Sequence, residues 1–261
     1  MTTDISLKGK TALVTGASRG IGAAIAAELG ARGAAVAVNY LRSEEEAGKV
    51  IAGIEERGGR AIGAQADIAD GESTAAMIAE VERELGPIDI LVLNSSGYRE
   101  VLRGPALNHS VEALVGKMAT QARATLGPAY AVLPGMIERE SGTVILISDS
   151  FSRQAAAGAI GHAVAKAPME AAMKHLAIEL GPKNIRFNTV IPGATRSENL
   201  MKKWDAKDEW GRTLASVVDQ TPLRRIGEPE DVAKAVAVLA GDELAYVTGA
   251  FLPVSGGHLI I

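Results

Sequence analysis

The sequence contains no cysteine among its 261 residues, and it has no long hydrophobic run. The first absence excludes disulfide bridges, thiolate metal sites and cysteine nucleophiles, although a cysteine-free chain fits any redox compartment. A membrane-spanning helix needs a run of about 18 apolar residues or more, and none occurs. The first ten residues also lack the apolar core of a signal peptide. We therefore expect a soluble cytoplasmic protein.

A basic surface is missing as well. The formal net charge is −4, and residues of both signs are spread along the chain. Nothing in this distribution points to nucleic acid or to a membrane surface. The composition favours small-molecule chemistry, and no motif in the chain calls for a metal ion.

Short apolar segments alternate with longer amphipathic segments along the whole chain. Residues 43–58 and 72–86 open with acidic residues and close on glycine, as helices do. The apolar segments lack strict alternation, which suits parallel strands covered by helices on both faces. We predict an α/β fold in a single domain, residues 1–261, with strands at 11–15, 34–40, 61–65, 88–93, 143–148, 185–191 and 250–254.

One long segment, residues 194–220, carries mixed signals and both tryptophans, Trp204 and Trp210. In a compact domain such an insertion is typical of a lid over a substrate site. A pair of surface helices is the alternative interpretation.

A glycine-rich turn follows the first predicted strand. Gly16, Gly20 and Gly22 stand between that strand and a helix, inside the first β-α-β unit. Glycines let the turn tighten and let backbone N–H groups approach a pyrophosphate at the helix N-terminus. The arrangement predicts a dinucleotide site.

The end of the second predicted strand indicates which dinucleotide. An NAD site normally has an acidic residue there for the ribose 2′-hydroxyl. This chain has Tyr40 at that place, with Arg42 and Ser43 just beyond it and Arg19 inside the glycine turn. Guanidinium groups suit a 2′-phosphate, so we predict NADP(H); the alternative is that both arginines are merely solvated.

These features make the chain resemble the short-chain dehydrogenases/reductases over nearly its whole length. The family's glycine motif matches residues 15–22, its adenine-contacting acid matches Asp67, and its Pro-Gly turn matches Pro192 and Gly193. Residues 38–47 and 221–240 look most like the polyketide and polyhydroxynaphthalene reductases, which use NADPH. The resemblance implies a doubly wound, seven-stranded parallel sheet of Rossmann type and a homotetramer built on two central helices.

The same resemblance implies which residues bind the cofactor. The family's Asn-Asn-Ala-Gly motif is altered at 93–97 but keeps Asn94, and Ser197 stands where a threonine often binds the nicotinamide amide. Lys166 would bind the nicotinamide ribose. Together with the charge argument, this gives the predicted cofactor-binding residues Gly16, Ser18, Arg19, Gly20, Ile21, Gly22, Tyr40, Arg42, Ser43, Asp67, Ile68, Asn94, Ser95, Lys166, Pro192, Gly193 and Ser197.

The chain departs from the family at the catalytic positions. The spacing of the family's Asn, Ser, Tyr and Lys places the predicted catalytic residues at Gln121, Asp149, His162 and Lys166, of which only the lysine keeps its family identity. No tyrosine lies between Tyr130 and Tyr246, so no change of register restores the motif.

Hydride transfer needs only a nicotinamide held against an acceptor, so proton donation is the step that these replacements affect. Reduction of an isolated ketone generates an alkoxide that is about as basic as hydroxide, so the site must protonate it promptly. A quinone or an extended aromatic ketone gives a phenolate-like oxygen with a pKa nearer to about 10. His162 is a candidate acid for the second case, while Asp149 either pairs with His162 or pairs with Lys166 and leaves the imidazole neutral. An ionised Asp149 would repel a developing oxyanion, which argues against simple ketones as substrates.

The sequence therefore favours an NADPH-dependent oxidoreductase that reduces a quinone or a polycyclic aromatic or polyketide carbonyl. One alternative is a dehydratase, cyclase or isomerase of the same fold that uses Asp149 and His162 as an acid/base pair. The other is a catalytically silent NADP-binding protein.

Overall fold

The centre of the molecule is one parallel sheet of seven strands in the order β3-β2-β1-β4-β5-β6-β7. The computed structural model describes residues 6–96, 102, 104–197, 201 and 209–260, with the backbone alone for 209–214. Each strand lies within two residues of its predicted bounds: β1 (Thr11–Val14), β2 (Ala35–Tyr40), β3 (Arg60–Gln65), β4 (Ile90–Leu93), β5 (Gly142–Ile147), β6 (Ile185–Pro192) and β7 (Phe251–Val254). The predicted α/β, doubly wound sheet is confirmed.

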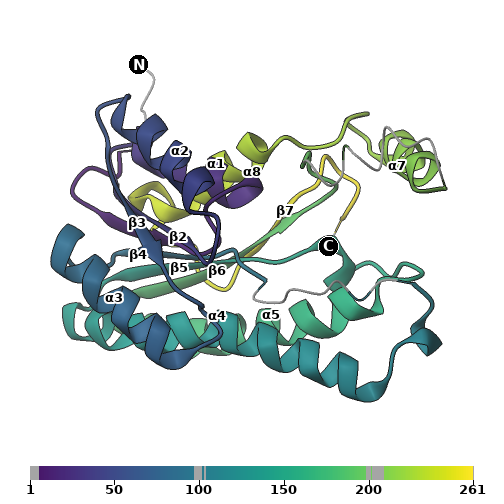
Figure 1. Ribbon diagram of the computed structural model, residues 1–261, viewed down its shortest axis with the longest axis horizontal. Helices are drawn as coiled ribbons and strands as arrows, with labels where there is room; N and C mark the ends of the chain where they lie inside the picture. The colour runs from purple at the N-terminus through teal and green to yellow at the C-terminus, as the bar shows by residue number, and fades with distance from the viewer. Residues whose placement is uncertain (1–5, 97–101, 103, 198–200, 202–208, 261) are drawn as a thin grey trace.

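Helices cover both faces of the sheet (Figure 1). One face carries α1 (Gly20–Ala31), α2 (Glu44–Glu55) and α8 (Pro229–Ala240). The other carries α3 (Gly71–Leu85), α4 (Val111–Arg139) and α5 (Ile160–Leu180). Helix α7 (Glu209–Gln220) lies beside the sheet, and four short 3₁₀ turns complete the described elements: Ala106–Asn108, Ser150–Ser152, Gly181–Lys183 and Asp242–Leu244.

The strand sequences explain this layering. Every residue of β1, β4, β5 and β6 is buried. The first three of these strands are rich in Val, Ile and Leu without polar alternation, whereas β6 also buries Arg186, Asn188 and Thr189. A strand of that composition must be covered on both faces. Two helix starts are capped by a local side chain: Asp70 accepts a 2.8 Å hydrogen bond from the Ser73 N–H at α3, and Ser110 caps α4 in the same way.

The chain order reverses between β1 and β4. From β1 the chain runs outward through β2 and β3, then returns to place β4 on the other side of β1. In open parallel sheets, ligands bind in the crevice outside the carboxyl ends of the strands at such a reversal. The turns after β1, β4 and β5 lie together at the carboxyl ends of these strands, so we expect the site there.

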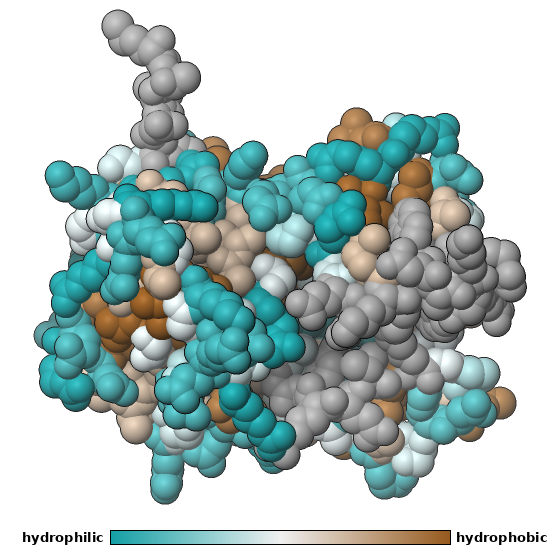
Figure 2. Space-filling view, turned by 45° about the horizontal axis from the view of Figure 1, so that its top comes forward, coloured by the Kyte–Doolittle hydropathy of each residue, from teal (hydrophilic) through white to brown (hydrophobic). Residues whose placement is uncertain are grey.

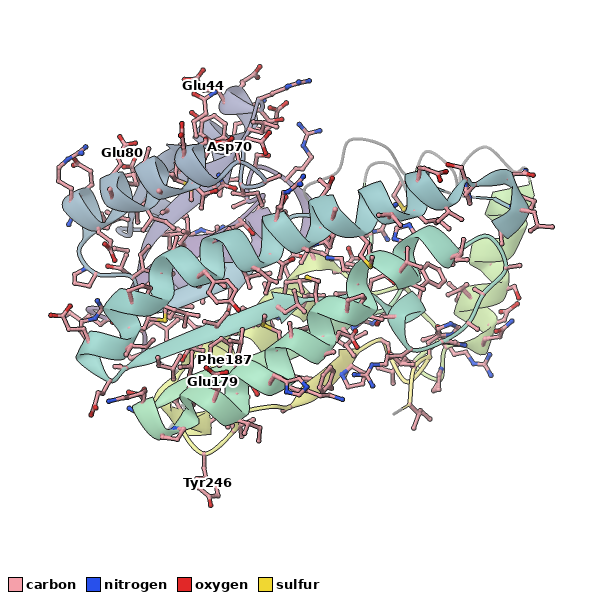
Figure 3. All side chains as sticks on the ribbon, turned by 90° about the horizontal axis from the view of Figure 1, so that it is seen from below. Glu44, Asp70, Glu80, Glu179, Phe187 and Tyr246 are labelled. Atoms are coloured by element: carbon pink, nitrogen blue, oxygen red, sulfur yellow. The ribbon has the colours of Figure 1, made fainter. Side chains whose placement is uncertain are left out.

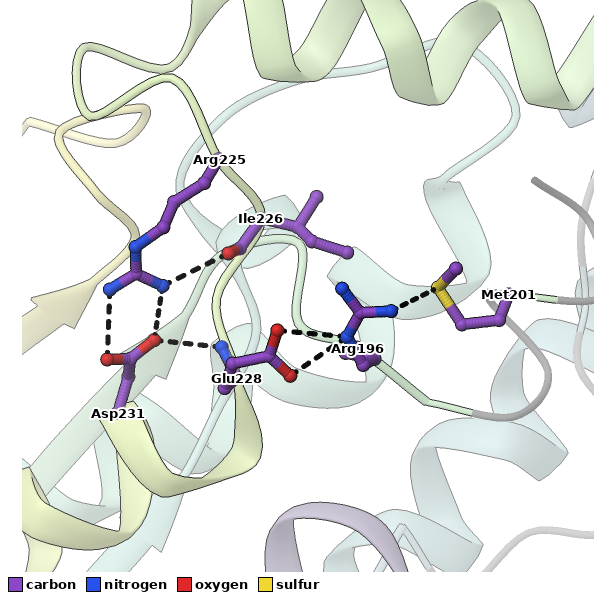
Figure 4. Close-up of polar contacts among 6 residues, drawn as sticks. All are labelled: Arg196, Met201, Arg225, Ile226, Glu228 and Asp231. Atoms are coloured by element: carbon purple, nitrogen blue, oxygen red, sulfur yellow. Dashed lines mark hydrogen bonds and ion pairs between the residues drawn. The ribbon is translucent and has the colours of Figure 1, made fainter.

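Segment 194–220 is only partly described. Trp204 and the side chain of Trp210 lie outside the described residues. The start of the segment is fixed to the N-terminus of α8: the Gly227 N–H donates to the Ala194 carbonyl, and the Arg196 N–H donates to the Gly227 carbonyl, both at 2.8 Å. Arg196 Nε also lies 2.9 Å from each carboxylate oxygen of Glu228 (Figure 4).

None of the described helices is both long and apolar enough to pass through a bilayer. The face seen in Figure 2 is largely hydrophilic, with apolar residues gathered in separate smaller areas. Among the described residues, no three His, Asp or Glu side chains are grouped so that they could hold a metal ion.

Candidate functional site

The glycine turn is built on a contact that admits no side chain. A Cβ added at Gly22 would lie 2.3 Å from the Gly16 carbonyl oxygen and 2.6 Å from Nδ2 of Asn94. Gly16 and Gly20 have φ values of +62° and +56°, the left-handed region in which glycine is at ease. The turn ends at Gly20, where α1 begins and its free N–H groups face the edge of the sheet.

The turn is tied to the end of β4. Asn94 Nδ2 donates to the carbonyl oxygens of Thr15 and Gly16 at 3.0 and 3.1 Å. The Thr15 hydroxyl in turn accepts hydrogen bonds from the backbone N–H groups of Asn94 and Ser95 at 3.0 and 3.1 Å. Asn94 therefore holds the glycine turn against the end of β4.

Asn39 is a supporting residue that the sequence reasoning missed. It is buried at 2 % exposure on β2, and its Oδ1 accepts a 3.0 Å hydrogen bond from the Gly16 N–H. Its Nδ2 donates to the Ala64 carbonyl on β3, also at 3.0 Å. Its one sequence signal was a polar residue inside an otherwise apolar strand.

A pocket of about 400 Å³ opens beside this turn. Nine of the predicted cofactor-binding residues line it: Gly16, Ser18, Arg19, Tyr40, Arg42, Ser43, Asp67, Ile68 and Ser95. Four further lining residues were not predicted: Asn39, Leu41, Ala66 and Ser96. The pocket lies between the carboxyl ends of β1, β2, β3 and β4, where the adenosine half of a dinucleotide would fit.

The rim of this pocket beside β2 is basic. Arg19 Nη2 lies 2.5 Å from Oγ of Ser43, and Arg42 is exposed next to it. Burial, together with the charges of Glu44 and Glu80, raises the pKa of Tyr40, so this phenol stays neutral. Asp67 is the acidic residue in the lining, and it lies at the β3 end of the pocket, where its Oδ1 accepts from the Ala69 N–H.

The other predicted cofactor residues do not line this pocket. Ile21 follows Gly20 in the first turn of α1. Pro192 ends β6, Gly193 packs closely against the backbone of Ser255, and Ser197 is exposed. The last three lie at or after the carboxyl end of β6, away from the adenosine pocket, as expected for the nicotinamide end of a bound dinucleotide.

Asp149 and His162 form a pair. Oδ2 of Asp149 lies 3.0 Å from Nδ1 of His162, and its Oδ1 accepts a 2.7 Å hydrogen bond from the Phe151 N–H. The Phe151 ring lies against the imidazole, with 5.8 Å between ring centroids. Asp149 follows β5 and His162 lies in the first turn of α5, so the two are brought together by the turn that joins these elements.

The environment keeps Asp149 ionised. Burial alone would raise its pKa, but the contact with His162, the Phe151 N–H and the charge of Lys166 together lower it below its usual value. Both ring nitrogens of His162 are buried, and neither has a hydrogen-bond partner among the described residues, so Asp149 and Nδ1 are in close contact without hydrogen-bond alignment. With the carboxylate beside Nδ1, Nε2 is the ring nitrogen left to exchange a proton with a ligand.

Lys166 is buried one turn further along α5. Its Nζ donates a 3.0 Å hydrogen bond to the Ile147 carbonyl. Burial lowers its pKa to about 8, against the opposing effect of the Asp149 and Glu170 charges. Of the two pairings that the sequence left open for Asp149, the structure has the one with His162.

Gln121 is fully buried on α4 and belongs to a separate part of the site. Its Nε2 donates to Oγ1 of Thr125 at 2.8 Å and approaches the Ser95 carbonyl at 3.5 Å, while its Oε1 has no partner among the described residues. Within the described residues no hydrogen bond joins it to Asp149 or His162. The structure thus brings Asp149, His162 and Lys166 together, and it connects Gln121 to the end of β4.

Comparison with known proteins gives consistent matches over nearly the whole chain. The family model described as "Enoyl-(Acyl carrier protein) reductase" matches residues 16–258. Versicolorin reductase 1 of Aspergillus parasiticus is 38% identical over 260 residues, covering 96% of this chain and 97% of that protein. The 3-oxoacyl-[acyl-carrier-protein] reductase of Pseudomonas aeruginosa is 36% identical, covering 97% of this chain and 98% of that protein.

Solved structures match as well. A short-chain dehydrogenase/reductase variant of Serratia marcescens superposes with a TM-score of 0.85 at 30% identity, covering 97% of this chain and 98% of the other. A 7α-hydroxysteroid dehydrogenase in complex with NADH and 7-oxo glycochenodeoxycholic acid gives a TM-score of 0.88 at 28% identity, covering 98% of this chain and 97% of the other.

Proposed function

We propose that this chain, which belongs to the short-chain dehydrogenase/reductase family and is an NAD(P)-dependent oxidoreductase, uses NADPH to reduce a quinone or a polycyclic aromatic or polyketide carbonyl. The observation that carries the proposal is the 3.0 Å contact between Asp149 and His162 beside the buried Lys166. When bound, the nicotinamide would supply the hydride, and this pair would supply the proton.

The charge of Asp149 decides between substrate classes. The family's usual hydroxyl at this position can donate a hydrogen bond to a substrate carbonyl, whereas an ionised carboxylate can only accept one. A localised alkoxide, a base about as strong as hydroxide, would form beside that negative charge and need a strong proton donor. A phenolate, whose conjugate acid has a pKa of about 10, spreads its charge over a ring, so an imidazolium is acid enough to protonate it.

The proposal predicts a clear separation between acceptors. With NADPH present, quinones and polycyclic ketones are expected to be reduced at least about 100-fold faster than aliphatic ketones, because loss of matched general-acid catalysis costs about 10² to 10⁴ in rate. The measurement is the oxidation of NADPH, followed by absorbance, over a panel of both classes. Equal rates for both classes, or none with either, would contradict it. Product formed without NADPH consumption would favour the dehydratase, cyclase or isomerase alternative.

We also propose that NADPH is preferred over NADH. Arg19 and Arg42 flank the adenosine pocket where a 2′-phosphate would lie, and Tyr40 leaves that end of β2 without a carboxylate. Glu46 approaches Arg19 to 3.9 Å, but both side chains are at the surface and solvent weakens their attraction.

Arg19→Ala is therefore expected to weaken NADPH binding by about 10- to 100-fold, the worth of one hydrogen bond to a charged group. NADH binding should change little, because NADH lacks the phosphate. Fluorescence titration with both cofactors measures this, with Arg57→Ala as an exposed control outside the pocket. An equal loss of affinity for both cofactors would show that Arg19 supports the glycine turn and does not bind the 2′-phosphate.

Membership of this family suggests two further features. Residues 194–220 are proposed as the substrate lid, since their start is anchored to α8 while α7 projects beside the open edge of the sheet. A homotetramer is proposed because α4 presents the exposed apolar residues Val111, Val115 and Met118 at one-turn spacing beside α5, which would be covered by a second copy of the chain.

A further inference from the structure

A buried carboxylate contacts the turn that carries Asp149, and it is not among the predicted site residues. Glu170 lies on α5, one turn after Lys166, and only 3 % of it is exposed. Its Oε1 accepts a 2.5 Å hydrogen bond from the Ser148 hydroxyl and a second from the Ser152 hydroxyl. Its Oε2 accepts a 2.6 Å charged hydrogen bond from Nε of Arg153.

All three partners of Glu170 come from one short stretch of chain. Ser148 immediately precedes Asp149, and Ser152 and Arg153 follow it within the same turn. The Ser152 hydroxyl also lies 2.7 Å from the Asp149 carbonyl oxygen. Glu170 therefore binds this turn, residues 148–153, through residues on both sides of Asp149.

A second anchor supports the turn from the sheet. The Arg153 guanidinium stacks over the Phe251 ring of β7, 4.2 Å from its centroid. A planar guanidinium held by a carboxylate on one side and an aromatic face on the other has little freedom to move. The turn that carries Asp149 is thus fixed to α5 and to β7.

A buried carboxylate is costly to desolvate, and packed apolar residues often stabilise a fold equally well. An apolar side chain at position 170 could not hold two serine hydroxyls and an arginine. We propose that Glu170 is a positioning residue, which through Ser152 and Arg153 holds the turn where Asp149 meets Nδ1 of His162. This inference rests on the proposed function, because it assigns a purpose to the Asp149 and His162 pair.

Glu170 also acts on Lys166 through its charge. The charges that act on Lys166 are those of Asp149 on the turn and Glu170 on α5. Each of these carboxylates has a further partner: His162 contacts Asp149, and Arg153 pairs with Glu170. Glu170 is one of the two carboxylates that oppose the lowering of the Lys166 pKa, which stands at about 8. Removing its charge should lower that pKa further, so the ammonium form would be lost at a lower pH.

The test compares Glu170→Gln with Glu179→Gln, an exposed glutamate on the same helix (Figure 3). Glu170→Gln is expected to reduce kcat for a quinone by about 10- to 100-fold, as for other small misplacements of a catalytic group. The KM for the quinone should change much less. The alkaline limb of the pH profile, which we assign to loss of the Lys166 ammonium, should move to lower pH. Glu179→Gln should match the unsubstituted protein in each measurement.

Readouts without turnover keep this test separate from the proposed function. The imidazole signals of His162, assigned in NMR spectra through His162→Phe, should shift in Glu170→Gln while NADPH binding is retained. Ser152→Ala removes one link to the turn but keeps the Glu170 charge, so it should shift the His162 signals and leave the alkaline limb in place. If folded Glu170→Gln and Ser152→Ala both leave the His162 signals unchanged, Glu170 does not position the pair. If the signals shift in a protein that reduces no quinone, the positioning holds and the proposed substrate class is wrong.

Discussion

Gly22→Ala is expected to weaken NADPH binding by about 10- to 100-fold, because forcing an extra methyl group into a packed contact costs about 1–3 kcal/mol. The new Cβ would lie 2.3 Å from the Gly16 carbonyl oxygen, an atom of the backbone that cannot swing aside. To make room, the glycine turn has to move away from α1. The N–H groups that would bind the pyrophosphate move with it.

The position of Asn94 makes this effect specific. The same Cβ would lie 2.6 Å from Nδ2 of Asn94, which donates to the carbonyl oxygens of Thr15 and Gly16. The substitution therefore disturbs the turn and its support together. Isothermal titration with NADPH measures the loss, and a thermal melt reports how much of the change is global destabilisation.

Gly48→Ala is the matched control. Gly48 lies exposed in the middle of α2, its added Cβ would contact nothing within 4 Å, and alanine favours the helix. Unchanged NADPH affinity and equal or higher stability are expected. Should Gly22→Ala bind NADPH as well as this control does, the glycine turn is not the pyrophosphate site.

Local patterns made most of the fold predictable. The strands could be predicted because each is an apolar run bounded by turn residues. The glycine turn could be predicted because its whole motif lies within eight consecutive residues. Nine predicted residues line the adenosine pocket for that reason, since each lies at the end of a predicted strand or in the turn that follows it. The match to the family over residues 16–258 supports the same fold.

What remained hidden depends on contacts between distant positions. Asn39 binds the Ala64 carbonyl 25 residues away, and Glu170 binds Ser148 22 residues away. A polar residue in an apolar strand or helix shows that something holds it, but the partner is known only once the chain is folded. For the same reason, spacing placed Asp149 and His162 at catalytic positions without deciding between His162 and Lys166 as the partner of Asp149.

His162→Phe is expected to lower kcat for quinones by about 10² to 10⁴, the usual contribution of a positioned general acid. Phenylalanine can still pack against the Phe151 ring, 5.8 Å from the imidazole in the present arrangement, so the fold and the adenosine pocket should be kept. NADPH affinity should therefore stay within about 3-fold, a difference of less than one kcal/mol. Stopped-flow absorbance separates the hydride step from cofactor binding.

His162→Tyr sharpens the interpretation, because a phenol beside Lys166 restores the family's usual proton donor. With Asp149 still ionised, the negative charge opposes a localised alkoxide, so little reduction of aliphatic ketones is expected from the single substitution. Asp149→Ser combined with His162→Tyr removes the charge and supplies the hydroxyl, and this double variant should gain aliphatic ketone reduction while losing its preference for quinones. If His162→Phe reduces quinones at the original rate, the proton comes from another group. If the double variant gains nothing, the substrate class is determined by the shape of the pocket rather than by the charge of Asp149.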